Sequence, residues 1–185
     1  MKIRISVLFV LLFSTTYLAQ AQWNSWGRGI TGEGASVVKE IDLATLEGIA
    51  LSIGANVYIR QGNSQKIEIK AQQNIIDNIK REVNGGVWKI GFDENVKKHN
   101  PITIRMTVKS LEKVVVTGSG DVTGEGAFTK ASDMTLSVSG SGGIDLELET
   151  GELTCRITGS GDIDAAGNAD RQDITITGSG NLESR

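Results

Sequence analysis

A four-residue pattern, Thr/Ser-Gly-Ser-Gly, recurs four times in the second half of the chain at nearly equal spacing. The steps between copies are 22, 19 and 19 residues, and the copies begin at Thr117, Ser139, Thr158 and Thr177. Thirteen of the 23 glycines lie in residues 118–185, so glycine is concentrated where the pattern recurs. A fixed step of about 20 residues is typical of repeat architectures, in which each copy is one structural unit.

Alternating apolar and polar residues separate the copies, most clearly in Ile144-Asp-Leu146-Glu-Leu148 and Leu153-Thr-Cys155-Arg-Ile157. A period of two, with β-branched residues in the apolar set, predicts strands with one buried face. Glycine adopts positive φ angles without steric cost, and serine hydroxyls bond nearby backbone, so the copies themselves predict turns. The eight turn glycines are Gly118, Gly120, Gly140, Gly142, Gly159, Gly161, Gly178 and Gly180.

Turns at one phase of every repeat predict a β-solenoid with rungs of 19–22 residues, because each coil must return the chain above its own start. Stacked turns would align their serines at about 4.8 Å, the spacing of paired strands. Two aliphatic columns would then fill the interior: Val116, Val138, Ile157 and Ile176 in one, and Val122, Ile144, Ile163 and Leu182 in the other. An antiparallel meander is the alternative architecture.

The outward columns of this solenoid are rich in acids. Directly after the turns come Asp121, Gly143, Asp162 and Asn181, with no two acids on adjacent rungs. Two positions later the column is Thr123, Asp145, Asp164 and Glu183, and like charges on neighbouring strands destabilise a sheet. Calcium prefers carboxylate oxygens, so Asp145, Asp164 and Glu183 are candidate Ca²⁺ ligands, although solvent can also screen such a surface row.

The first 21 residues have the layout of a secretory signal peptide. Lys2 and Arg4 precede an apolar run from Val7 to Phe13, and Ala19-Gln-Ala21 fits a cleavage site, with Gln22 the first mature residue. The run is too short for the alternative, a membrane anchor, and no later segment is apolar enough to span a bilayer. We therefore expect an exported protein of the periplasm, the outer surface or the extracellular space.

Charge and rare residues exclude several classes of function. Residues 118–185 carry 4 basic and 12 acidic side chains, a net of −8, whereas residues 22–117 have a net of +3. Nucleic acid is therefore an unsuitable partner, since phosphate binding needs a basic patch. A single cysteine and a single histidine exclude an internal disulfide and most histidine-based metal or acid-base sites. Cys155 shares the parity of buried residues, and His99 lies in a charged loop, so we assign neither a catalytic role.

Residues 22–45 mix glycine and polar residues and predict a flexible segment; its Trp23 and Trp26 are one conceivable sugar-stacking pair. Residues 46–117 predict a β-rich part. Its features are alternating strands near 49–53, 57–60, 67–70 and 102–108, a hairpin at Asn84-Gly-Gly86, and one short helix from Asn74 to Lys80 with Asn74 as its N-cap.

The mature chain resembles the putative auto-transporter adhesin, head GIN domain family of secreted bacterial proteins, a domain of unknown function. The resemblance rests on the leader, Ile53-Gly-Ala-Asn-Val-Tyr-Ile-Arg-Gln-Gly62, Asn74-Ile-Ile-Asp-Asn-Ile79 and the recurring Gly-Ser-Gly-Asp, and covers residues 46–185. It implies a β-solenoid in a cell-envelope or extracellular setting, and it implies no catalytic residues or cofactors.

These observations favour a non-enzymatic adhesive or structural module whose partner is a surface glycan or a protein. Two alternatives stay open: a calcium-dependent module using the acidic column, and a polysaccharide-acting enzyme using Asp145, Asp164 and Glu147. The repeat stops after its fourth turn, at Glu183-Ser-Arg185, so the pattern also predicts truncation at the C-terminus and self-association through an open last rung.

Overall fold

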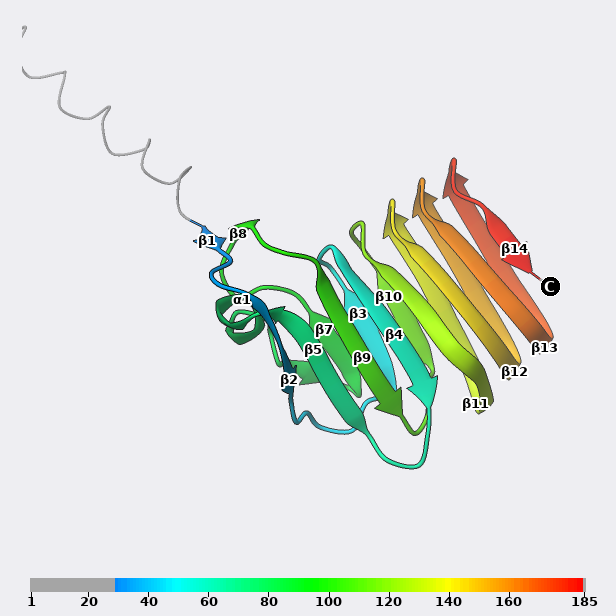
Figure 1. Ribbon diagram of the computed structural model, residues 1–185. Coiled ribbons are helices and arrows are strands. Elements are labelled where there is room, and N and C mark those ends of the chain that lie inside the picture. Colours follow the sequence, from blue (N-terminus) through cyan, green and yellow to red (C-terminus); the bar gives the residue numbers. More distant parts are fainter. Residues whose placement is uncertain (1–28, 185) are drawn as a thin grey trace, which may run out of the picture.

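The protein is represented by a computed structural model that describes residues 29–184. The predicted signal peptide, Trp23 and Trp26 lie outside these residues. The chain is all-β with one short helix, and Figure 1 shows its strands side by side from β2 at one end to β14 at the other. The elements are β1 (Ile30–Thr31), β2 (Ser36–Glu40), β3 (Gly48–Leu51), β4 (Ala55–Gln61), β5 (Lys66–Gln72), α1 (Gln73–Asp77), β6 (Val83–Asn84), β7 (Val87–Ile90), β8 (Val96–Lys98), β9 (Ile102–Val108), β10 (Lys113–Val116), β11 (Asp121–Gly140), β12 (Gly143–Gly159), β13 (Asp162–Gly178) and β14 (Leu182–Ser184).

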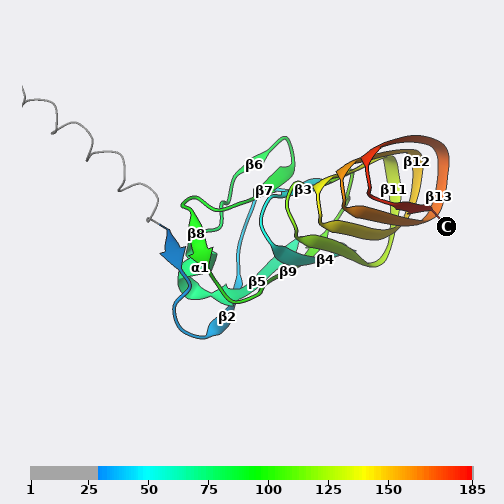
Figure 2. The same ribbon diagram turned by 90° about the horizontal axis from the view of Figure 1, so that it is seen from above.

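Twelve of the strands form one curled sheet, while β1 and β8 pair separately. Its long strands β11, β12 and β13 each bend round, so that their two ends lie on opposite sides of the core (Figure 2). The start of β11 pairs with β4, whereas its end pairs with β10. We call the side with β2, β5, β9, β4, β14 and the starts of the long strands the first layer. The second layer holds β6, β7, β3, β10 and the ends of the long strands.

The pairing in the second half of the chain is parallel and in register. β11 pairs with β12, β12 with β13, and β13 with β14, which excludes an antiparallel meander for these strands. The turn glycines follow the same register, since Gly140 pairs with Gly159 and Gly159 with Gly178. The register of both predicted aliphatic columns is confirmed: Val116 lies beside Val138, Ile157 and Ile176 in turn, and Val122 beside Ile144, Ile163 and Leu182. The first column is not buried throughout, because Ile176 is 45% exposed.

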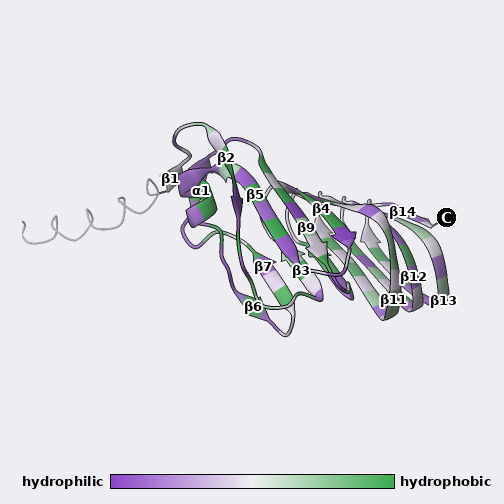
Figure 3. Cartoon of the chain, turned by 60° about the horizontal axis from the view of Figure 1, so that its bottom comes forward, coloured by the Kyte–Doolittle hydropathy of each residue, from purple (hydrophilic) through white to green (hydrophobic). Residues whose placement is uncertain are grey.

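One continuous apolar core fills the curled sheet. It arises from the alternation along the strands, which Figure 3 shows as bands of apolar and polar residues. β9 is a clear case, because Ile102, Ile104, Met106 and Val108 are at most 3% exposed while the residues between them face outward. Cys155 points into the core, as its parity predicts, and is 1% exposed. Residues 46–117 and 118–185 share this sheet and core without a break.

The N-terminal end of the core is covered by α1 and by the β6–β7 hairpin. Ile75 and Ile76 of α1 are fully buried, and Trp88 of β7 is buried with its indole N–H donating to the Lys80 carbonyl. Gly85 and Gly86 adopt φ values of 56° and 74°, as the predicted hairpin requires. Within residues 29–184, no helix is long and apolar enough to cross a bilayer.

Two expectations about the first half need correction. Asn74 is not the N-cap, since α1 begins at Gln73 and its cap, Gln72, makes no side-chain capping bond. The Asn74 amide instead accepts from the Glu33 N–H and donates to the Thr31 carbonyl, which holds the N-terminal segment. That segment is also more regular than its composition suggests, because β2 pairs antiparallel with β5 along five residues. The edge position of β2 leaves Val37 and Val38 exposed, so its sequence lacks the alternation of a half-buried strand.

Candidate functional site

The outward face of the first layer gathers most of the charged side chains that the sequence singled out. One row of in-register neighbours crosses it from β5 to β14, and we call it the charged row. Each member pairs with the next across a strand boundary, so its order is set by register alone. The row consists of Glu68, Arg105, Tyr58, Thr123, Asp145, Asp164 and Glu183.

The charge changes sign along this face. Its β4, β5 and β9 part carries Arg60, Lys66, Lys70 and Arg105, whereas the starts of β12 and β13 carry acids and no base. The net charges of the two halves of the sequence therefore appear as two ends of one surface. Such a separation steers charged partners to one end or the other over a distance of several ångströms.

In the basic half, the charged side chains contact one another on the outward surface of the sheet. The Arg105 guanidinium lies over the Tyr58 ring, 4.5 Å from its centroid, and forms an ion pair with Glu125. Lys66 donates to Glu68 at 2.9 Å and lies 3.5 Å from Glu40. The hydrogen bond to Glu68, followed by the charge of Glu40, raises the pKa of Lys66, so this side chain keeps its positive charge.

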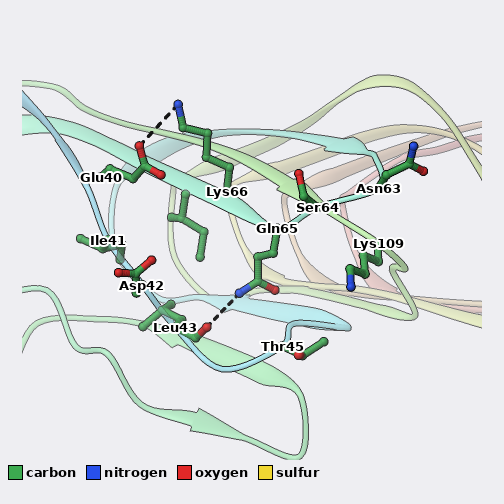
Figure 4. Close-up of a pocket in the computed structure, with 11 residues that line it drawn as sticks. Glu40, Ile41, Asp42, Leu43, Thr45, Asn63, Ser64, Gln65, Lys66 and Lys109 are labelled. Carbon is green, nitrogen blue, oxygen red and sulfur yellow. Dashed lines mark hydrogen bonds and ion pairs between the residues drawn. The ribbon is translucent and has the colours of Figure 1, made fainter.

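Two polar hollows open beside these side chains, and Lys66 lines both. The larger, of about 310 Å³, lies among the loops that join β2 to β3, β4 to β5 and β9 to β10 (Figure 4). In this hollow the Gln65 amide is already engaged, donating to the Leu43 and Ala44 carbonyls. The smaller, of about 230 Å³, lies on the sheet and is lined by Arg60, Lys66, Glu68, Arg105, Met106, Thr107 and Glu125.

In the acidic half, the structure brings the three candidate calcium ligands into one column. Asp145 pairs with Asp164, and Asp164 with Glu183. Neighbours on a parallel sheet are about 4.8 Å apart, so the backbones of the outer two of three residues in a line are separated by roughly 10 Å. In residues 29–184, no group of three His, Cys, Asp or Glu side chains is placed to hold a metal.

The acids considered for catalysis lie on this same open face. Glu147 is two positions beyond Asp145 on β12, and it pairs with Ala166. Neither hollow includes Asp145, Asp164 or Glu147. Glycosidases hold a sugar between an acid and a base in a concave site, and neither of these two hollows supplies such surroundings for the three carboxylates.

The column directly after the turns has a structural task that the sequence did not reveal. The Asp121 carboxylate accepts a 2.9 Å hydrogen bond from the Gly143 N–H on the next strand. Asp162 does the same for the Asn181 N–H, also at 2.9 Å. The aspartates of Gly-Ser-Gly-Asp thus tie one turn to the next.

Cys155 and His99 both lie away from the charged face. Burial raises the pKa of the Cys155 thiol to about 11, so it remains protonated and unreactive at neutral pH. His99 packs edge-on against Phe92, with ring centroids 5.9 Å apart, and its Nδ1 lies 2.6 Å from the Asn100 carbonyl oxygen. Both positions are accounted for by packing.

The chain is similar to known proteins in both sequence and fold. The sequence matches the model of the family described as "putative auto-transporter adhesin, head GIN domain" over residues 45–185. No protein with a curated description matches the chain. A putative lipid binding protein from Parabacteroides distasonis has a similar structure, with a TM-score of 0.69, 22% sequence identity, and coverage of 84% of this chain and 76% of its own.

Two further solved structures are similar to this chain. One is a putative adhesin from Parabacteroides merdae, with a TM-score of 0.55, 14% identity, and coverage of 85% of this chain and 99% of its own. The other is a putative adhesin from Bacteroides fragilis, with a TM-score of 0.51, 15% identity, and coverage of 85% and 100%. At these identities the similarity concerns the fold.

Proposed function

The chain belongs to the putative auto-transporter adhesin, head GIN domain family, and on that premise we propose that it is an exported, non-enzymatic binding module that presents its charged face to a surface glycan or protein. The charged row supports this proposal, because the register of the sheet lines up basic side chains at one end of the row and acidic side chains at the other. A rigid sheet fixes the spacing of its outward side chains, so a regular partner meets a preorganised surface.

We also propose that residues 118–185 are rungs of a β-solenoid, with one Gly-Ser-Gly corner per rung. The in-register parallel pairing of β11, β12 and β13 supports this description, as does the bond from the Ser141 N–H to the Gly118 carbonyl, which links the first two corners. In this architecture the acidic half of the charged face is built from successive copies of one position of the repeat. Its length then scales with the number of rungs.

The proposal is tested on an array of glycans and extracellular-matrix proteins, probed with the purified mature chain in the presence and absence of calcium. Arg105→Glu reverses one charge in the centre of the charged row. Its matched control is Arg156→Glu, since Arg156 is an exposed arginine of β12 in the second layer. We expect the first variant to lose binding to the partner that the array detects and the control to retain it. A chain that binds nothing on the array, or two variants that bind equally, would refute the proposal.

A further inference from the structure

Three cationic side chains from three strands meet at the smaller hollow. Arg60 of β4, Lys66 of β5 and Arg105 of β9 line it, together with Glu68 and Glu125. Register brings them together, because Thr107 of β9 lies between Arg60 on one side and Lys66 on the other. The hollow therefore carries three positive and two negative charges, and it lies in the basic half of the charged face.

Arg60 supplies the charge that remains uncompensated. Lys66 is paired with Glu68 and Glu40, and Arg105 is paired with Glu125. The Arg60 Nε donates to the Thr107 hydroxyl at 3.0 Å, and among the described residues no carboxylate lies within ion-pair distance of its guanidinium. A guanidinium is permanently charged, and its terminal nitrogens form a fork that matches a carboxylate. The hollow thus offers one anion-binding group whose orientation is already fixed by Thr107.

The remaining lining favours a sugar over an isolated anion. Glu68 and Glu125 accept hydrogen bonds from hydroxyl groups, and they repel a multiply charged ion such as phosphate. The Thr107 side chain and the apolar Met106 complete the lining of the hollow. A carboxylate flanked by hydroxyls satisfies this combination of donors and acceptors, whereas a neutral sugar leaves Arg60 unmatched.

We propose that this hollow binds the carboxylate of a uronic acid residue in an acidic polysaccharide, with Arg60 as the principal carboxylate ligand. The inference rests on the proposed function and names its ligand class. Lys66 lines both hollows, so adjoining sugars extend toward Asn63, Ser64 and Lys109 of the larger one (Figure 4). The acids of β12 and β13 repel a polyanion, so the bound polysaccharide extends away from these strands.

The test is calorimetric titration of the purified chain with a linear tetrasaccharide of galacturonic acid. Maltotetraose serves as the neutral ligand of equal length, and inorganic phosphate as the anion without a sugar. We expect the galacturonate tetrasaccharide alone to bind, and its affinity to fall as salt is added. Tighter binding of phosphate, or equal binding of maltotetraose, would overturn the assignment.

Three substitutions locate the site. Arg60→Gln should weaken binding of the galacturonate tetrasaccharide at least ten-fold, whereas Arg156→Gln in the second layer should leave it unchanged. Glu125→Gln should strengthen binding, because it removes a negative charge beside the bound carboxylate. All three side chains are exposed, so circular dichroism should confirm an unaltered fold. If the chain binds array partners but Arg60→Gln behaves as the wild type, the proposed function survives and this assignment fails; if it binds no partner at all, both fail.

Discussion

At the scale of single residues, the acidic side chains that look alike in the sequence divide into two groups. Asp121 and Asp162 are engaged with backbone N–H groups of the following strand. Asp145 and Asp164 are register neighbours at outward positions of β12 and β13, where Asp145 is exposed and Asp164 is half-buried. The first group stabilises the stack through hydrogen bonds, and the second destabilises it by repulsion between like charges.

Neutralising one member of the second group should therefore stabilise the protein. Asp145→Asn is expected to raise the free energy of unfolding by about 0.2–1 kcal/mol at low salt, and by less at high salt. Glu149→Gln is the control, since the register neighbour of Glu149 is the uncharged Asn168. Urea denaturation with and without calcium measures both variants. A calcium-dependent rise in the free energy of unfolding of the wild type that Asp145→Asn abolishes would contradict this and establish a cation site.

At the scale of the elements, both glycines of a corner permit close approach between strands, and in three of the four corners the first glycine also has a positive φ. Gly140, Gly159 and Gly178 have φ values of 141°, 118° and 124°, which L side chains rarely adopt. The second glycine permits close approach between strands, because a Cβ on Gly161 would lie 2.3 Å from the Gly142 carbonyl oxygen. Gly118 is an exception among the first glycines, since its φ is not positive and its Cβ would meet ordinary contacts at 3.4 Å.

This difference gives a matched pair of substitutions at the same position of the repeat. Gly159→Ala should lower the free energy of unfolding by about 1–3 kcal/mol, because alanine must adopt a strained φ and also contacts the Gly140 carbonyl. Gly118→Ala should cost much less. Chemical denaturation of the two variants measures the difference, and equal destabilisation would show that the corners are not distinguished by backbone conformation.

At the scale of the whole molecule, the two ends of the core differ in how well they are covered. The N-terminal end is covered by α1 and the β6–β7 hairpin, whereas Ile174 and Ile176 in the second half of β13 are each 45% exposed. Their neighbours one strand below, Cys155 and Ile157, are at most 1% exposed. β14 pairs only with Ile163, Asp164 and Ala165, so it leaves that part of β13 as an edge.

A purified chain of this sequence should consequently associate as its concentration rises, through the edge formed by the second half of β13. Ile176→Lys should reduce this association, because a charge on the edge opposes pairing with another strand. Val38→Lys is the control, since Val38 is 63% exposed on β2 at the other end of the sheet. Sedimentation velocity over a range of concentrations measures all three proteins; a wild type that stays monomeric at high concentration would contradict the expectation.

Much of the second half of this fold follows from local sequence signals. Turn glycines at a fixed step and strict alternation between them determine where strands end and which side chains face inward, so the two aliphatic columns and the buried Cys155 could be predicted. The acidic column could also be predicted, because register follows once the corners align. The capping bonds of Asp121 and Asp162 could not, since they depend on where each carboxylate meets the next strand.

In the first half, the pairing of distant strands sets which side chains meet. β4 and β5 are consecutive in the chain, yet β9 lies between them in the sheet, and this order brings Arg60, Lys66 and Arg105 to one hollow. No local pattern marks those three residues, because each is an ordinary outward position of its strand. Near neighbours in the chain set the repeating corners, the aliphatic columns and the unequal charge of the two halves. The long-range pairing of strands decided the basic hollow, because only packing sets which distant segments meet.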